Sequence, residues 1–380
     1  MIPPARWDAS GHRACPRRAL PRVPRLSSIL FWDSTCQRPY DTRSIRTEAT
    51  GGTEASLVRV ADALDAFVIQ HNRDRAEGRY RPPARIAGIT DVVLNRDCRA
   101  YPDVRALYPN ARFHLWVHDQ LTPETKRGRR LADAAAVLGS ESVDIVCVSN
   151  WQRRLLDAML DRLSLRDRVS TRTIYNPIDD ALVPDDTPVD RNKLVFFSAQ
   201  NRGLMYALDA FRELRRRMPE LQLVIGNPGY KVRKTGEFAG VTNLGPQPQW
   251  RIHAEVRSAL CTFFPNFVLP ETFGLVFAES MAMGTPLLTH DAGAAAEVIG
   301  DREQVRPAAA PQRAYERAMR AVPARLRGGP SRVAAKLGMF DDYCDRIRAW
   351  REGSRPRTVP DPRFRLSCVA GQWRTLLAGA

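Results

Sequence analysis

Two carboxylates eight residues apart, Glu271 and Glu279, lie in the stretch TFFPNFVLPETFGLVFAESMAMGTPLLTHDAGAAAEVIGD. Glu271 follows Pro270, which suits an extended loop. Gly274 permits a tight turn, after which LVFAESMAM predicts a helix that ends near Gly284. Glu271 is therefore expected just outside this helix and Glu279 about one turn inside it.

The junction between this loop and helix is suited to an anion. Backbone N–H groups at Gly274, Leu275 and Val276 would have no helical partner, and the helix dipole favours negative charge there. Carboxylates on either side would accept hydrogen bonds from hydroxyls. A sugar nucleotide has this layout, because its diphosphate is flanked by hydroxyls at both ends.

The pattern resembles the donor-site signature of retaining glycosyltransferases with the two-domain GT-B fold, of the group 1 or family 4 type. The resemblance rests on the spacing of the two Glu residues, on Phe-Pro at 264–265 and on Gly-Thr-Pro at 284–286. An ordinary solvated helix with an acidic face is the alternative for the two Glu residues alone. The resemblance implies that the donor is held by Glu271, Phe273, Gly274, Leu275, Val276 and Glu279.

A second donor element is implied at Arg202 and Gly203, which follow a predicted strand at 193–200. They match a basic residue and glycine that contact the donor diphosphate in the family, and Arg can bind phosphate with two donors. Family members commonly carry another basic residue about five positions earlier, where this chain has Phe197. The group of residues that would bind the donor diphosphate then lacks one positive charge, unless Lys231 or Lys234 supplies it.

The first half of the chain carries two further candidate elements. Gly51-Gly52-Thr53-Glu54 precedes a predicted helix, and the resemblance implies that Gly51, Gly52 and Glu54 face the acceptor and the donor phosphates. A plain helix start with Thr53 as the N-cap is the alternative.

His118 closes a predicted strand at 111–119 and matches a family histidine near the transferred sugar. Asp119 is expected to orient it, as carboxylates orient other functional histidines. A histidine at a strand end is more often a structural hydrogen-bonding residue.

Alternation of strands and helices predicts parallel α/β sheets, in which ligands bind at the carboxyl ends of strands. Buried strands are expected at 26–32, 67–72, 85–95, 111–119, 143–150, 193–200 and 221–230. Helices are expected at 249–260, 311–328 and 331–350.

A chain of 380 residues predicts two domains. The resemblance implies two Rossmann-like α/β domains facing a central cleft, with the C-terminal helix crossing back to the first domain. The expected parts are a disordered basic extension, an acceptor-side domain, a nucleotide-sugar domain and a crossover segment, at 1–25, 26–185, 186–345 and 346–380.

Composition favours a soluble globular protein, with 44% hydrophobic and 26% charged residues. No apolar run reaches the about 18–20 residues of a membrane helix, and residues 1–25 lack the apolar core of a signal peptide. Seven scattered cysteines without CxxC pairs argue for a reducing compartment and against zinc or disulfides. We expect a cytoplasmic protein, peripheral on the inner face of the plasma membrane.

The net charge of +16 gathers at the chain ends. Residues 1–25 hold six Arg and one Asp, and residues 320–380 hold thirteen basic and five acidic side chains. Such ends favour an anionic membrane surface. A general bias toward Arg is the alternative. A nucleic-acid partner is not expected, because interleaved basic and aromatic stripes are missing.

The resemblance implies a hexosyltransferase that moves a sugar from a nucleotide diphosphate sugar to a glycan or lipid-linked acceptor, with retention of configuration. His118 and Glu271 are the expected catalytic residues, and no metal or other cofactor is expected. The main alternative is a degenerate scaffold that binds a nucleotide sugar or an envelope partner without turnover. An epimerase fits less well because of the spacing of the two Glu residues in this setting. A retaining glycosidase fits less well because Glu279 is expected on the helix behind the phosphate-binding turn.

Overall fold

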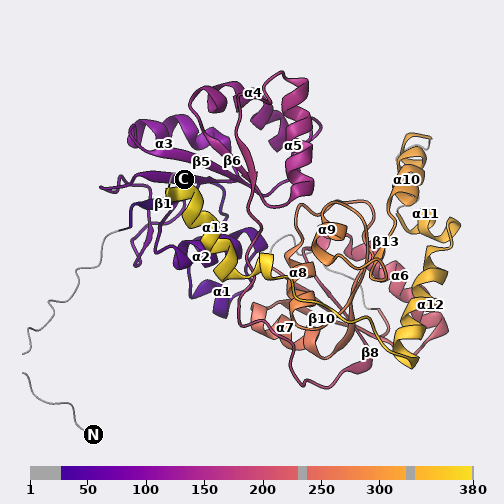
Figure 1. The fold of residues 1–380 in the computed structure, drawn as a ribbon. Coiled ribbons are helices and arrows are strands. Elements are labelled where there is room, and N and C mark those ends of the chain that lie inside the picture. Colours follow the sequence, from indigo (N-terminus) through magenta and orange to yellow (C-terminus); the bar gives the residue numbers. More distant parts are fainter. Residues whose placement is uncertain (1–26, 230–237, 322–329, 379–380) are drawn as a thin grey trace, which may run out of the picture.

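The computed structural model describes residues 27–229, 238–321 and 330–378. Two α/β domains lie side by side and meet along one face (Figure 1). The two-domain α/β architecture expected from the sequence is confirmed. The expected disordered extension at 1–25, together with Lys231 and Lys234, lies outside the described residues.

The first domain has, within the described residues, one parallel sheet of seven strands in the order β3-β2-β1-β4-β5-β6-β7. Its strands are β1 Ile29–Asp33, β2 Phe67–Gln70, β3 Tyr80–Arg81, β4 Asp91–Asn95, β5 Arg112–Val117, β6 Asp144–Cys147 and β7 Thr171–Thr173. Its helices are α1 Ser44–Thr47, α2 Gly52–Ala63, α3 Tyr101–Leu107, α4 Lys126–Ser140 and α5 Asn150–Arg162.

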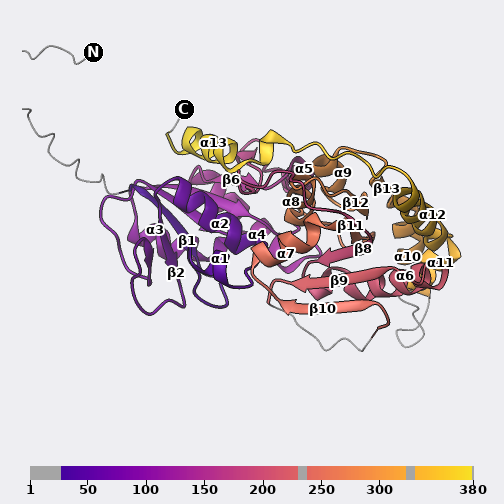
Figure 2. The ribbon, with the colours of Figure 1, turned by 90° about the horizontal axis from the view of Figure 1, so that it is seen from below.

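The second domain has a parallel sheet of six described strands in the order β10-β9-β8-β11-β12-β13. The strands are β8 Asp190–Phe197, β9 Gln222–Asn227, β10 Val241–Pro246, β11 Ala259–Phe264, β12 Leu287–His290 and β13 Val305–Arg306. The helices are α6 Leu204–Arg217, α7 Gln249–Arg257, α8 Leu275–Ala282, α9 Ala295–Ile299, α10 Ala309–Ala321, α11 Pro330–Lys336 and α12 Met339–Glu352. Helices α10 to α12 lie at the end of this domain that is far from the first (Figure 2).

Sequence pattern accounts for these layers. The central strands β4 and β11 are buried along their whole length, which is why their sequences DVVLN and ALCTFF are nearly continuous apolar runs. The covering helices are amphipathic: α4 buries Leu131, Ala135 and Leu138, which share one helical face.

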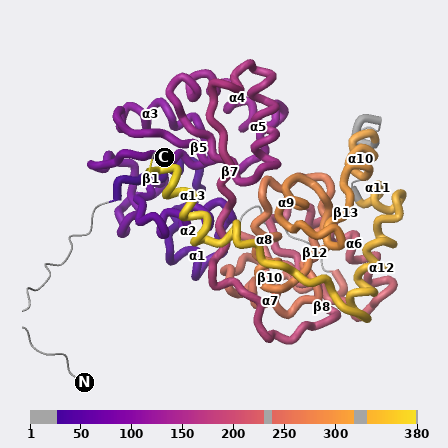
Figure 3. The backbone as a smooth tube through the Cα atoms, in the orientation of Figure 1, coloured from indigo at the N-terminus to yellow at the C-terminus, as the bar shows by residue number. Residues whose placement is uncertain are grey.

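The last helix, α13 (Leu366–Ala378), crosses back to the first domain and packs against α2 (Figure 3). Its Trp373 makes edge-to-face contacts with Phe31 and Trp116, at centroid distances of 5.9 and 5.1 Å. The returning chain also pairs with the outgoing linker, because Ile178 N donates to Phe364 O (2.8 Å) and Leu366 N donates to Ile178 O (3.0 Å). The two connections between the domains therefore form a short parallel ribbon.

Several expected element bounds were wrong. The strand expected at 85–95 is shorter in the structure, where β4 begins at Asp91 and residues 85–90 are largely exposed. The helix expected at 249–260 ends at Arg257, after which Ala259 enters the sheet. The helix expected at 331–350 is broken at Gly338, whose φ of 65° ends one helix and starts the next. Strand β3, only two residues long, was not predicted.

Candidate active site

The candidate site lies at the points where the strand order of each sheet reverses. In the first sheet the order reverses between β1 and β4, and in the second between β8 and β11. In open parallel sheets, ligands bind outside the carboxyl ends of strands at such points. A cavity of about 190 Å³ lies there and is lined by both domains, with His118 from the first and Glu271 from the second.

The donor turn has the predicted form. Gly274 adopts a φ of 83° and is the N-cap of α8. Within the described residues no hydrogen bond reaches the backbone N–H groups of Leu275 and Val276, and both residues line the cavity with Phe273 and Gly274. The start of α8 thus offers unused donors and the positive end of a helix dipole to a ligand.

Glu271 is held by its backbone on the neighbouring loop. Its N–H donates to Ala292 O (3.2 Å), and its carbonyl accepts from Ala294 N (2.8 Å). Gly293 makes this approach possible, because a Cβ there would lie 2.2 Å from Glu271 O. Burial raises the pKa of Glu271, and Arg202, whose Nε lies 3.7 Å from Oε1, offsets part of this effect.

Glu279 has two basic side chains beside it inside the cleft. Arg59 Nη2 lies 3.2 Å from its Oε1, and His253 Nε2 lies 3.5 Å from its Oε2. Arg59 also donates to Pro177 O (3.0 Å) and to Gln249 Oε1 (2.8 Å). Burial alone would raise the pKa of Glu279, but His253 and Arg59 together hold it below its usual value.

Arg59 was missed by sequence reasoning. It stands in the apolar run LVRVADAL of α2, where a single charge is usually a solvent-facing residue of an amphipathic helix. The signal available in the sequence was that Arg59 stands between two apolar residues, Val58 and Val60. All three residues are buried in the structure.

Arg202 ends a short 3-10 helix after β8 and lines the cavity, whereas Gly203 behind it does not. The Arg202 side chain is 41% exposed and makes no hydrogen bond within the described residues. Phe197 and Ser198 line the same cavity, so the position of the absent second cation does face the site. Arg202 also lines an adjoining cavity, together with two further arginines, Arg38 and Arg96.

His118 is buried, with its ring 4.5 Å from the ring of Trp116. Neither ring nitrogen has a hydrogen-bond partner in the described part of the chain. Burial, followed by the nearby charge of Arg96, lowers the pKa of His118 to about 3. The imidazole is therefore neutral at physiological pH and can both donate and accept a hydrogen bond.

Asp119 does not orient His118, contrary to our expectation. Its carboxylate is bound by Arg96 through Nε (3.1 Å) and Nη2 (2.9 Å), and Arg127 Nε lies 2.6 Å away. The Asp119 carboxylate forms stronger, charge-assisted hydrogen bonds with two guanidinium groups than it would form with a neutral imidazole.

A larger cavity of about 490 Å³ adjoins the first. Gly51 and Glu54 line it, while Gly52 lines the smaller cavity. The two cavities share five lining residues: Thr50, Thr53, His118, Arg202 and Pro228. Gly51, and not Thr53, is the N-cap of α2. The Gly-Gly-Thr-Glu turn thus lies between the two cavities.

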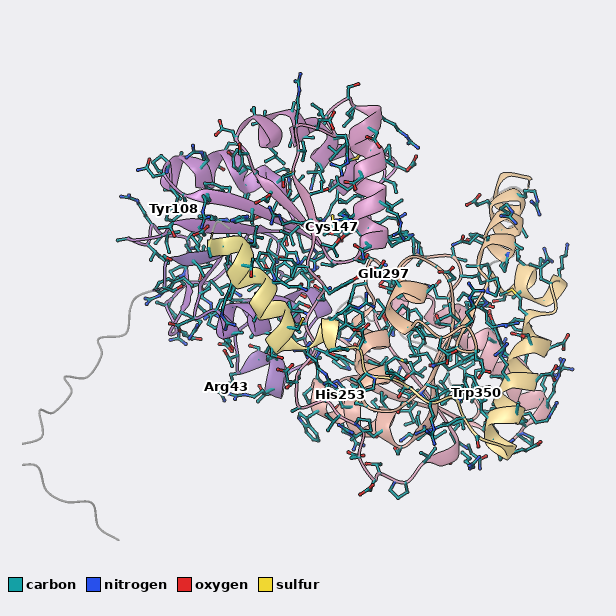
Figure 4. All side chains as sticks on the ribbon, viewed as in Figure 1. Arg43, Tyr108, Cys147, His253, Glu297 and Trp350 are labelled. Carbon is teal, nitrogen blue, oxygen red and sulfur yellow. The ribbon has the colours of Figure 1, made fainter. Side chains whose placement is uncertain are left out.

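The domains are closed against each other by hydrogen bonds beside the site. Glu297 of α9 accepts the backbone N–H groups of Asn150 and Trp151 at the start of α5, each at 2.8 Å. Tyr175 OH donates to the same carboxylate (2.9 Å). Glu297 lies where the domains meet (Figure 4). Thr272 Oγ1 donates to His118 O (2.7 Å), which ties the donor loop to the strand end that carries His118.

Other kinds of site are not found in the described residues. They hold no cluster of three His, Cys, Asp or Glu side chains placed to bind a metal, and the six described cysteines are free thiols. None of the described helices is long and apolar enough to cross a membrane.

The arginines of the C-terminal segment bind largely to the protein itself. Arg351 pairs with Glu220, Arg363 with Asp361, and Arg365 donates to the carbonyl of Leu182 (2.6 Å). Much of the positive charge of the C-terminal segment is therefore engaged in contacts within the protein.

Comparisons with known proteins agree with this geometry. Residues 191–322 match the family described as glycosyl transferases group 1. Curated proteins give no significant sequence match.

Solved structures match over most of the chain. Anabaena HepE in complex with UDP and glucose superposes with a TM-score of 0.60 at 14% identity, over 93% of this chain and 100% of that one. HepE with UDP-glucose gives 0.62 at 12% identity, with the same coverage. Sucrose-phosphate synthase from Thermosynechococcus elongatus gives 0.57 at 14% identity, again over 93% and 100%. The chain therefore has the GT-B fold, and residues 191–322 of its second domain are similar to the group 1 glycosyltransferases.

Proposed function

We propose that this protein transfers a sugar from a nucleotide diphosphate sugar to a glycan or lipid-linked acceptor, with retention of configuration. The observation that carries the proposal is the placement of Arg202 and Glu271 beside the free N-terminus of α8, in a cavity between two domains. The HepE structures, which contain UDP and UDP-glucose, support a nucleotide-sugar donor.

The donor diphosphate would lie on the backbone N–H groups of Leu275 and Val276 and against the Arg202 guanidinium. Phe273 and Gly274 shape the turn, and Gly203 starts the helix behind Arg202. Glu279 would accept ribose hydroxyls, and Glu271 hydroxyls of the sugar.

In the proposed reaction, the bond from the anomeric carbon to the diphosphate breaks and a bond to the acceptor oxygen forms on the same face. The acceptor proton passes to the departing phosphate oxygen. Arg202 and the α8 N-terminus stabilise the negative charge that develops on the leaving group, which is the main catalytic contribution. The neutral imidazole of His118 would hydrogen-bond a sugar hydroxyl and would not act as an acid.

No metal is required in this scheme, because Arg202 and the N-terminus of α8 supply the positive charge that stabilises the leaving diphosphate. Arg38 and Arg96 in the adjoining cavity are candidates for the cation that Phe197 does not supply. The six free cysteines suit a reducing compartment such as the cytoplasm. Contact with an anionic membrane would use basic surface near the chain ends.

A non-catalytic scaffold that binds a nucleotide sugar is the second candidate. It is favoured by one observation, the apolar Phe197 at the phosphate side of the cavity. The two candidates differ in turnover, since both bind the donor.

The first test is thermal stabilisation by UDP, GDP, ADP and their sugars. A ligand at a hundred times its Kd stabilises a protein by about 2.7 kcal/mol. We expect one nucleotide to raise the melting temperature of the wild type and to lose most of this effect with Glu279→Gln. The isosteric change is preferred to Glu279→Ala because it keeps an oxygen for Arg59. No stabilisation by any nucleotide, in folded protein, would refute both candidates.

Turnover is then measured with the sugar of that nucleotide. Formation of a glycoside or slow hydrolysis of the donor supports the transferase, and binding without either supports the scaffold. NMR of the anomeric proton in the product tests retention. Activity that persists in EDTA tests independence of metal.

A further inference from the structure

Asn227, the last residue of β9, presents a hydrogen-bond donor to the smaller cavity, which it lines. Its Oδ1 accepts a hydrogen bond from the backbone N–H of Gly229 (2.9 Å). Because a backbone N–H can only donate, this contact fixes which end of the amide is the oxygen. The other end, Nδ2, is buried and has no hydrogen-bond partner in the described part of the chain, and Asn227 is only 4% exposed.

Gln249, the first residue of α7, lines the same cavity and also has a fixed amide direction. Its Oε1 accepts a hydrogen bond from Arg59 Nη2 (2.8 Å), and a guanidinium has donors only. Nε2 is therefore the end of the Gln249 amide that is left for a ligand. Asn227 and Gln249 thus each offer an N–H donor to the cavity.

Gln247 lines the cavity as well, but its amide is fixed in the opposite sense. Its Nε2 donates to the carbonyl of Leu244 (2.8 Å), which can only accept. Its Oε1 is therefore the end left for a ligand. The three amides of the second domain that line the cavity together offer two donors and one acceptor.

These amides lie beside the position proposed for the ribose. Arg59 Nη2, which binds Gln249, also lies 3.2 Å from Oε1 of Glu279, the residue proposed to accept ribose hydroxyls. The base of a nucleotide is joined directly to its ribose. A ribose on Glu279 would therefore bring the base within reach of Gln249.

An apolar wall suited to a flat base lies next to Asn227. Gly226 has no side chain, and a Cβ there would lie 2.1 Å from Ile252 Cδ1 and 4.0 Å from Phe197 Cβ. Ile252 and Phe197 both line the cavity. Apolar and aromatic side chains with a few placed polar groups are typical of small-molecule sites, and bases stack on aromatic rings.

Two donors and one acceptor are complementary to a pyrimidine with two carbonyl groups. Uracil has two carbonyl oxygens with an N–H between them. Adenine has no carbonyl, guanine has one carbonyl beside an N–H and an amine, and cytosine has an amine in place of one carbonyl. Each of these three bases would turn an amine toward a side-chain donor, and polar groups left unpaired in a site lower the affinity.

We propose that Asn227 and Gln249 select the base of the donor by donating hydrogen bonds to two carbonyl groups, so that the donor is a uridine diphosphate sugar. Gln247 accepts a hydrogen bond from the N–H of the base. Arg59 is a positioning residue, because it fixes the direction of the Gln249 amide. This inference rests on the proposed glycosyl transfer and names the nucleotide of its donor.

The test measures Kd for UDP, CDP, GDP, ADP and dTDP with the full chain by isothermal titration calorimetry. We expect UDP to bind more tightly than CDP, GDP or ADP by about tenfold or more, as the loss of one or more hydrogen bonds predicts. The base of dTDP has the same two carbonyls, but its sugar lacks the 2′ hydroxyl, so UDP should bind more tightly than dTDP. Tighter binding of dTDP would replace uracil by thymine.

Asn227→Asp and Gln249→Glu give the residue-level readout. Each change removes the N–H donor and keeps the oxygen that Gly229 or Arg59 holds. The added negative charge weakens the binding of every nucleoside diphosphate, so the quantity compared is the ratio of Kd for ADP to Kd for UDP. We expect this ratio to fall by about tenfold in each variant.

Asn243→Asp is the matched control. Asn243 Oδ1 accepts a hydrogen bond from Gly245 N (2.9 Å) in the same kind of turn, but Asn243 is exposed and lines neither of the two cavities. Its ratio should equal that of the wild type. Melting temperatures without nucleotide show that each variant is folded, and Gln249→Glu, at a less buried position, carries the test if Asn227→Asp does not fold.

Failure of this inference differs from failure of the proposed function. If no nucleotide binds to the folded wild type, both are refuted. If GDP, ADP or CDP binds as tightly as UDP, a nucleotide-sugar donor stands and its assignment to uridine is wrong. If the folded variants keep the wild-type ratio, Asn227 and Gln249 do not select the base.

Discussion

Arg59 of the first domain forms a buried ion pair with Glu279 of the second, with 3.2 Å between Nη2 and Oε1. Their side chains are only 7% and 5% exposed. The same guanidinium binds the linker carbonyl of Pro177 and the side chain of Gln249. A donor whose ribose binds Glu279 must therefore share this carboxylate with Arg59, and closure of the domains and donor binding use the same group.

Replacing Arg59 should destabilise the protein strongly. Arg59→Met leaves the Glu279 charge buried with only His253 beside it, and removing one partner of a buried pair costs about 3–5 kcal/mol. We expect a correspondingly lower free energy of unfolding in urea and weaker stabilisation by the nucleotide. In the double variant Arg59→Met/Glu279→Leu, stability should largely return, whereas nucleotide binding should be lost because Glu279 is replaced. A single variant within 1 kcal/mol of wild type would contradict this account.

Arg202 should matter for rate and little for stability. Its side chain is partly exposed and makes only a 3.7 Å contact with Glu271, so Arg202→Gln should leave the melting temperature nearly unchanged. Because it would stabilise charge on the leaving diphosphate, kcat should fall by about two orders of magnitude. Arg212→Gln, on the exposed face of α6, is the control. Equal kcat values for Arg202→Gln and this control would exclude Arg202 from the reaction.

Glu297 should couple the two domains. It accepts two backbone N–H groups at the start of α5, and loss of a helix cap costs about 0.5–2 kcal/mol. We expect Glu297→Ala to lower stability by this amount and to increase the radius of gyration in small-angle X-ray scattering without ligand. Glu303→Ala, on an exposed loop of the same domain, should change neither. An unchanged radius of gyration for Glu297→Ala would show that other contacts hold the cleft closed.

His114 should give a pH-dependent contribution to stability far from the site. It lies between Asp91 and Asp144, 3.5 Å from each. Burial alone would lower the pKa of His114, but the two aspartates raise it above its usual value. The native state then holds the proton more tightly than the unfolded chain. The stabilisation is complete below about pH 6.5 and is lost as pH rises through the raised pKa.

The difference in unfolding free energy between wild type and His114→Gln should therefore be larger at pH 5.5 than at pH 9. His290 provides the opposite control, because burial lowers its pKa to about 3. Its contribution is present above about pH 6.5 and falls as the pH falls. If the His114 difference does not change with pH, the two aspartates do not hold its proton.

Much of the fold and of the position of the site was predictable from sequence. Long apolar strands alternating with amphipathic helices predicted two parallel sheets, and this was confirmed. The motif at Glu271 to Glu279 predicted a turn and a helix where the structure has them, because Pro, Gly and an apolar run act locally. The predicted residues lie around two adjoining cavities, except Gly203, and their chemical roles stay predictions.

The predictions that failed, and the contacts that were missed, concern side chains whose partners are distant in sequence. Asp119 was expected to orient His118, but its carboxylate pairs with Arg96 and Arg127 instead. The pair of Arg59 with Glu279 joins residues 220 positions apart, and no local pattern encodes it. Arg96, at a left-handed φ of 67° after β4, was noticed in sequence only as part of a polar strand end.

The paired connections at Ile178 and Arg365 limit how the two domains can move apart. The polypeptide leaves the first domain and returns to it along one hydrogen-bonded ribbon, so neither connection can slide without the other. We therefore expect the second domain to rotate about this ribbon when the two domains separate. Phe273 of the donor turn lies against this ribbon, with its ring 5.1 Å from the ring of Phe364, so a rotation at the ribbon would also move the donor turn.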